Sequence, residues 1–97
     1  MSAYLVLDIS IHDFRRFQVY IKNIPEFIEK HQGKYIVQGV EPEVMEGDWS
    51  PERMVILEFL SRDHAKNFLA DPEAQNLFKI RHNSTTSKLL LLEGAEP

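Results

Sequence analysis

The segment from Glu46 to Arg53 holds residue types that could bind or convert a small molecule. Trp49 offers a flat apolar wall, and the planar guanidinium of Arg53 is a donor group suited to a carboxylate. Glu46 could act as a general base, with Asp48 as a further polar contact. Together they would hold a small aromatic or carboxylated molecule. The alternative is a structural turn, in which Gly47 relaxes the backbone, Trp49 plugs the end of a sheet and Arg53 pairs with one of the two acids.

Two further carboxylates, Asp8 and Glu58, fall on the same face of neighbouring predicted strands. Beside an apolar interface each would raise the pKa of the other, and Glu58 would become a candidate acid–base residue. In the alternative reading each carboxylate lies at a solvated rim, because charges are seldom buried unpaired. Its partner would then be Arg15, Arg16 or Arg62.

Among the four histidines, His31 is the candidate for acid–base chemistry. It lies on the apolar side of a predicted helix near its end, where a protonated imidazole suits the helix dipole and a neutral one can face a pocket. The others, His12, His64 and His82, lie close to predicted helix ends. No pair has the close helical spacing of a metal site, so we predict neither a metal nor a cofactor.

Tyr35 and Arg81 complete the predicted ligand-binding set with Asp48, Trp49 and Arg53. Either could line a cavity between a sheet and its helices, and either could be ordinary packing. The hydroxyl-rich residues 84–87 lack a glycine-rich cradle, so we do not predict a phosphate loop there.

Composition excludes several classes of protein. Ninety-seven residues make one domain, spanning 1–97. Fifteen acidic residues against eleven basic ones give a net charge of −4, which disfavours nucleic acid as a partner. The chain has no cysteine and no apolar run near the roughly 20 residues that a membrane span needs. We therefore expect a soluble, cytoplasmic protein that does not bind membranes.

The periodicity of apolar residues predicts six elements in the order βαββαβ. Strands are predicted at 3–9, 34–38, 54–59 and 88–92. Pairing of the second strand could continue irregularly through Val44 and Met45. The first helix should begin near Asp13, kink or divide near Pro25 and end at Gly33 in a left-handed conformation. Ser61 should cap a second helix, and Asp71 with Pro72 should restart it. This order is the ferredoxin-like α+β pattern, a four-stranded antiparallel sheet with two helices on one face.

The predicted strands are apolar on both faces, which predicts a homodimer. A sheet with one wet face shows polar residues at every second position, and these strands do not. Burial of about six apolar side chains, roughly 100 Å² each, would contribute up to about 15 kcal/mol against association costs of about 4–15 kcal/mol. The alternative is that residues 94–97 cover this face, but they are few and polar.

The chain resembles the family called domain of unknown function 1330 over nearly its whole length. The segments that carry the resemblance are 35–39 (YIVQG), 46–53 (EGDWSPER), 55–59 (VILEF) and 71–73 (DPE). The resemblance implies a dimeric α/β barrel, in which two ferredoxin-like sheets pack face to face. Val40 stands where such proteins commonly have a second glycine, and Ala74 and Gln75 replace a frequent tyrosine. The superfamily includes cofactor-independent monooxygenases, muconolactone isomerase-like enzymes and haem-handling proteins.

Three functions are compatible with these residues. The first is a homodimeric module that binds a small aromatic or carboxylated molecule between sheet and helices, near His31, Tyr35, Trp49 and Arg53. The second is a cofactor-independent enzyme of the monooxygenase or isomerase type, with His31, Glu46 or Glu58 as the acid–base residue. The third is a purely structural dimer.

Overall fold

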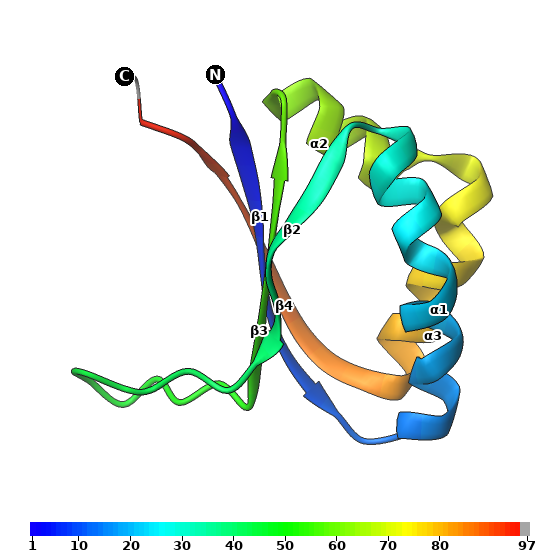
Figure 1. The fold of residues 1–97 in the computed structure, drawn as a ribbon. Coiled ribbons are helices and arrows are strands. Elements are labelled where there is room, and N and C mark those ends of the chain that lie inside the picture. Colours follow the sequence, from blue (N-terminus) through cyan, green and yellow to red (C-terminus); the bar gives the residue numbers. More distant parts are fainter. Residues whose placement is uncertain (96–97) are drawn as a thin grey trace.

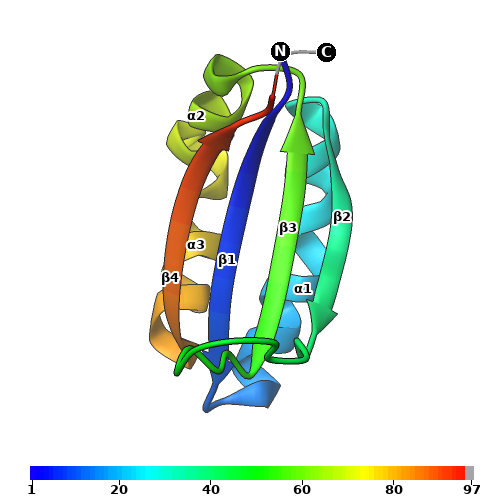
Figure 2. The same cartoon turned by 90° about the vertical axis from the view of Figure 1, so that its left-hand side faces the viewer.

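A four-stranded antiparallel sheet carries every helix on one of its faces (Figure 1). A computed structural model describes residues 1–95. The elements in chain order are β1 (Ala3–Ile11), α1 (Phe14–Lys30), β2 (Gly33–Val40), β3 (Arg53–Phe59), α2 (Arg62–Ala70), the 3-10 turn η1 (Pro72–Ala74), α3 (Gln75–Ser84) and β4 (Thr85–Glu93). The strand order across the sheet is β2-β3-β1-β4 (Figure 2). The predicted ferredoxin-like fold is confirmed, with the second helical stretch divided into α2, η1 and α3.

Helix α1 is one continuous helix, so of the two predicted outcomes at Pro25, a kink or a division, the division is wrong. Asp13 caps its start by accepting a hydrogen bond from the backbone N–H of Arg16. Pro25 cannot donate a backbone hydrogen bond. Its ring is exposed, however, while Ile24 and Ile28 are buried in the core. The apolar contacts on both sides of the proline therefore hold the helix together through the missing bond.

The left-handed residue after α1 is Gln32, with φ of 61°, and not Gly33 as predicted. Gly33 instead begins β2 and pairs with Phe59 of β3. A methyl group on Gly33 would lie 2.5–2.9 Å from three carbons of the Phe59 ring. Close approach of the backbone to a buried ring, and not backbone freedom, is thus the reason for glycine at this position.

The pairing of β2 with β3 shifts twice, between Tyr35 and Val37 and between Gln38 and Val40. Gly39 lies at the second shift with φ of 71°, which is typical of a β-bulge. Strand β2 ends at Val40, and residues 41–52 form a loop that stands out from the sheet on the side away from the helices (Figure 1). The predicted extension of strand pairing through residues 44–45 is therefore wrong.

The predicted starts of the second helical stretch are confirmed. The Ser61 hydroxyl accepts a hydrogen bond from the backbone N–H of His64, which caps α2. The Asp71 carboxylate accepts one from the backbone N–H of Glu73, and Pro72 follows at the first position of η1. These two caps place α2 and α3 end to end across the sheet.

As predicted, the strands carry apolar side chains on both faces of the sheet. The face toward the helices buries Leu5, Leu7, Ile9, Leu57 and Phe59. On the other face, which we call the open face, the apolar side chains of Leu90 and Leu92 are 55% and 51% exposed. No helix within residues 1–95 is both long and apolar enough to span a membrane.

Candidate functional site

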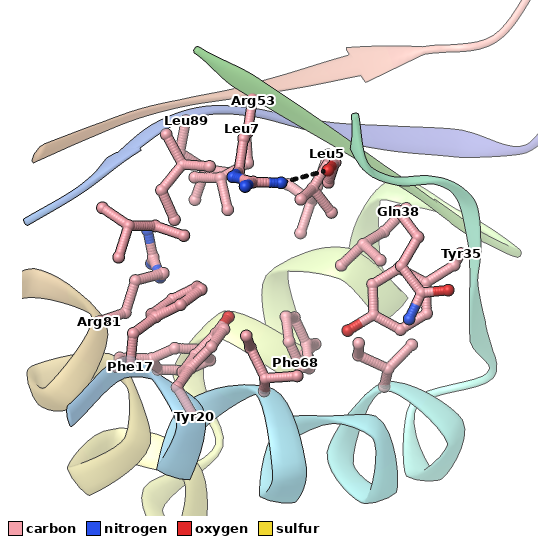
Figure 3. A pocket seen from close by; sticks show the side chains of 18 of the residues that line it. Leu5, Leu7, Phe17, Tyr20, Tyr35, Gln38, Arg53, Phe68, Arg81 and Leu89 are labelled. Atoms are coloured by element: carbon pink, nitrogen blue, oxygen red, sulfur yellow. Dashed lines mark hydrogen bonds between the residues drawn. The ribbon is translucent and has the colours of Figure 1, made fainter. Parts of the chain in front are cut away.

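A cavity of about 410 Å³ lies between the sheet and the helices (Figure 3). Small-molecule sites have volumes of about 300–1,000 Å³, so this cavity suits a compact ligand. Most of the wall is apolar and comes from both layers of the fold. Its apolar members include Leu7, Ile9, Phe17, Val55, Phe78 and Leu89. Exposed side chains of Phe14 and Ile21 on α1 lie at its rim.

Five polar side chains line the same cavity: Tyr20 of α1, Tyr35 and Gln38 of β2, Arg53 of β3 and Arg81 of α3. Figure 3 shows Arg81 at one side of the cavity and Tyr35 with Gln38 at the other. The structure thus brings together Tyr35, Arg53 and Arg81, three of the predicted ligand-binding residues. Apolar walls with a few convergent polar groups are the usual composition of a site for an organic molecule.

Arg81 is a buried cation at the wall of this cavity, and its side chain and backbone together are 5% exposed. Its Nη1 donates a hydrogen bond to the Ser87 hydroxyl at 3.1 Å. The guanidinium carbon lies 5.8 Å from the ring centroids of both Tyr20 and Phe78, within range of cation–π attraction. The Nε atom is buried and has no hydrogen-bond partner within residues 1–95.

Arg53 reaches the same cavity from the sheet. Its Nη1 donates to the Gly39 carbonyl at 3.1 Å, and no ion pair joins it to an acid of residues 1–95. In the sheet, Ile9 pairs with Arg53 on one side and with Ser87 on the other. Two strand spacings separate Arg53 from Ser87, which is roughly 10 Å. Because Arg81 is bonded to Ser87, the two guanidinium groups approach the cavity on either side of Ile9.

The two tyrosines of the cavity are neutral donors at physiological pH. Burial raises the pKa of Tyr20 to about 12, although the neighbouring Arg81 cation acts in the opposite direction. Burial also raises the pKa of Tyr35. The Tyr20 hydroxyl points into the cavity (Figure 3). It can therefore donate a hydrogen bond to a bound acceptor without itself losing a proton.

The rest of the predicted turn cluster lies away from this cavity, and only Arg53 reaches it. Glu46 and Asp48 are exposed in the loop 41–52, beyond the open face. The indole N–H of Trp49 donates to the Asp8 carboxylate at 2.8 Å, and the residue is 57% exposed. Trp49 and Glu46 line a separate, shallower hollow of about 260 Å³. The other side chains of this hollow include Pro42, Met45, Pro51 and Met54.

Glu58 also lies on the open face. Its carboxylate accepts one hydrogen bond from the Tyr4 hydroxyl at 2.9 Å and lies 3.5 Å from the Lys34 ammonium. The hydrogen bond from Tyr4 is the main cause of a lowered pKa of Glu58, and Lys34 lowers it further. Asp8 is paired with Met54 and Glu58 with Tyr4, so the two carboxylates are four residues apart along the sheet, about 13 Å. At this distance they do not form the close pair that the first hypothesis required, and the pKa of Glu58 is lowered where that hypothesis needed it raised.

His31 contributes to a junction between helices and does not line the cavity. Its Nε2 lies 2.8 Å from the buried Asp71 carboxylate, which also accepts from Lys30 at 2.9 Å. The hydrogen bonds from Lys30, His31 and the Glu73 backbone hold the pKa of Asp71 well below its usual range. Since Asp71 begins η1 and His31 ends α1, this junction fixes one end of α1.

None of the remaining histidines lines the cavity. The His64 ring nitrogen is 2.7 Å from the Ser61 hydroxyl at the start of α2. Burial, and then the charge of Arg81, lower the pKa of His82. Within residues 1–95, no three histidine, aspartate or glutamate side chains gather as a metal site would require.

Sequence reasoning missed Tyr20 and Gln38 as cavity residues. Tyr20 follows Phe17 by three positions and precedes Ile24 by four, so its place on the apolar side of α1 was open to prediction. Gln38 pairs with Val55 and faces the cavity only because the pairing of β2 with β3 shifts in register after Tyr35. That shift changes which residues of β2 point toward the helices. No pattern in the sequence marks that shift.

Solved structures of low sequence identity share this fold. The RPA0582 protein of Rhodopseudomonas palustris, whose function is unknown, is 17% identical with a TM-score of 0.81, and the match covers 99% of this chain and 84% of that one. SnoaB, a cofactor-independent oxygenase of Streptomyces nogalater, is 16% identical with a TM-score of 0.70, covering 99% and 95%. The de novo designed protein Foldit4 is 10% identical with a TM-score of 0.63, covering 98% and 100%.

These likenesses are of fold, and a designed protein among them illustrates that this fold can exist without an evolved activity. No curated protein matches the chain significantly. The family described as "Domain of unknown function (DUF1330)" matches residues 2–95, which is nearly the whole chain. The chain therefore belongs to the DUF1330 family.

Proposed function

We propose that this protein is a cytosolic homodimer that binds a small organic molecule in the cavity between sheet and helices. The observation that carries the proposal is the cavity itself, about 410 Å³ of mostly apolar space. Two arginines, two tyrosines and a glutamine converge on it from four different elements. A concave, mostly apolar space of this size, open at a rim and lined by a few polar groups, is the usual form of a site for an organic molecule.

The cavity favours binding over acid–base catalysis as the first proposal. His31, Glu46 and Glu58, the residues considered for an enzyme, lie in the helix junction, the loop and the open face. A general base must come within hydrogen-bond reach of its substrate, about 2.6–3.2 Å. A cofactor-independent oxygenase remains the second candidate, because SnoaB has the same fold. In that case Arg81 and Tyr20 would be the hydrogen-bond donors facing a negatively charged oxygen of the substrate.

A second copy of the chain would cover the open face. At its centre, Val6 of β1 pairs with Ile56 of β3 and with Leu90 of β4, forming a row of apolar side chains across the sheet. Val37 of β2 extends that row opposite Ile56. An apolar face of this extent is typical of a protein–protein interface. Face-to-face packing of two sheets would place identical rows against each other, about 10 Å apart.

The loop 41–52 supports the same assembly. It leaves the sheet on the open side (Figure 1) and presents apolar side chains to solvent, including Met45 at 81% and Trp49 at 57% exposure. Figure 2 shows it crossing the lower edge of the open face. In a face-to-face dimer such a loop would lie beside the partner's sheet, where these side chains would lose contact with water.

Native mass spectrometry of protein freshly purified from its host tests both parts of the proposal. We expect a dimer that retains a small molecule. Ile21→Trp, at the rim of the cavity, should reduce that retained mass, and so should Val55→Phe inside it. Lys22→Trp adds the same indole to the adjacent, exposed position on α1 and should leave the retained mass unchanged. An empty protein, or equal retention by all variants, would contradict binding in the cavity, and a monomer at micromolar concentration would contradict the dimer.

A further inference from the structure

Arg81 is unusual because it is a buried cation without a buried anion. It is 5% exposed, and no ion pair joins it to any carboxylate within residues 1–95. One nitrogen bonds to the neutral Ser87 hydroxyl, while buried Nε has no partner in the described chain. Taking a charged group out of water is costly unless it is paired, and arginine is almost never fully buried otherwise.

A structural role does not account for this arginine. It lies in the last turn of α3, where a cation suits the helix dipole, and it lies near two aromatic rings. Both effects become stronger as the cation loses water, but neither gives the buried Nε a hydrogen-bond acceptor within the described residues. A methionine or leucine would fill the same position between Tyr20 and Phe78 without leaving a donor unsatisfied.

The donors around Arg81 converge on one region of the cavity. Arg53 reaches it from the other side of Ile9, and its backbone lies roughly 10 Å across the sheet from Ser87, the hydrogen-bond partner of Arg81. The Tyr20 hydroxyl points into the same space (Figure 3). Two cations and a hydroxyl donor facing an apolar chamber form a receptor for a negatively charged group attached to an apolar body.

We propose that the ligand of this cavity is a compact apolar carboxylate, held with its carboxylate against Arg81 and its apolar body against Phe17 and Val55. This inference rests on the proposed function and adds the charge and the orientation of the bound molecule. The guanidinium presents two parallel N–H groups in the geometry that a carboxylate accepts. Arg53, which is exposed at the cavity, would meet the same anion as it enters and then close over it.

Isothermal titration calorimetry with 2-naphthoate and 2-naphthamide tests this proposal, because the two probes match in shape and differ in charge. We expect the wild-type protein to bind 2-naphthoate about 10- to 100-fold more tightly than 2-naphthamide. Arg81→Met should remove that preference, and Arg81→Lys should retain part of it, since lysine keeps the charge and loses the planar donor pair. Ser87→Ala removes only the internal partner of Arg81 and should leave the preference within a few fold.

The melting temperature of the ligand-free protein gives a second, independent measurement. Replacing an unpaired buried charge with an apolar side chain of similar length should raise the Tm of Arg81→Met by about 4 °C or more. A purely structural arginine predicts the reverse, a lower Tm. If the wild type binds the two probes equally and the Val55→Phe variant binds neither, the carboxylate assignment would be overturned. Binding in the cavity would still be supported. Failure of the wild type to bind either probe, together with an empty cavity in native mass spectrometry, would overturn both proposals.

Discussion

Replacing Gly33 with alanine should destabilise the protein through a single steric contact. The new Cβ would lie 2.5, 2.8 and 2.9 Å from three carbons of the Phe59 ring, where ordinary contacts begin near 3.4 Å. The ring has little room to move, because Phe59 is 1% exposed and packs against Phe68 with 5.3 Å between centroids. Overpacking of this kind costs about 1–3 kcal/mol, and the lower entropy of the unfolded chain returns about 0.4–1 kcal/mol.

The net penalty of about 1–2 kcal/mol corresponds to a Tm lower by roughly 4–16 °C in a domain of this size. Thermal and urea unfolding at one protein concentration would measure it. In a Phe59→Leu background the ring is absent, so the same Gly33→Ala change should cost much less. Gly47→Ala is the matched control, because its Cβ would meet nothing within 4 Å and any cost comes from its φ of 87° alone. An equal penalty at Gly33 with and without the Phe59 ring would refute the steric explanation.

Three further results are expected. The pKa of Asp71 is lowered in the folded state, so its contribution to stability is complete above its unfolded pKa of 3.8 and is lost as the pH falls below that value. Asp71→Asn should therefore lower Tm at pH 7 and flatten the fall in Tm as the pH drops below about 4; an unchanged acid profile would show that other carboxylates control it. Ile56→Arg, at the centre of the open face, should shift sedimentation from dimer to monomer, whereas Val19→Arg on the exposed side of α1 should not. Because Trp49 is the only tryptophan, its fluorescence should move to longer wavelength in the Ile56→Arg monomer; an unchanged spectrum would place the loop 41–52 outside the interface.

The fold could be predicted because its strands and helices follow simple periods. In β1 the apolar residues at every second position, Leu5, Leu7 and Ile9, form the buried face, and the residues between them form the opposite face. Pro25 misled the prediction of α1, since local backbone chemistry favoured a break there and the burial of Ile24 and Ile28 outweighed it. Gly33 misled the prediction of how α1 ends. Its contact is with Phe59, 26 positions later in the chain, and such a contact cannot be read from the local sequence.

The candidate site was predicted in part for similar reasons. Arg81, predicted as a possible cavity residue, does line the cavity, and it shares the buried side of its helical stretch with Ala74 and Phe78. Trp49 lies only four residues before Arg53, yet the chain turns away from the helices at the loop and returns into β3, so the two residues end on opposite faces of the sheet. That reversal depends on the three-dimensional course of the loop, which has no periodic pattern to indicate it.

Strand β1 is a wall shared by two compartments, and this constrains how the protein can change. Its odd-numbered residues from Leu5 to Ile9 border the cavity, while Val6 and Asp8 between them belong to the opposite face. Inserting or deleting one residue within this strand would exchange the two sets and damage both compartments at once. Substitutions, in contrast, alter one compartment at a time. Adaptation to new ligands should therefore accumulate by replacement within β1, while length variation is confined to the loop 41–52 and the chain ends.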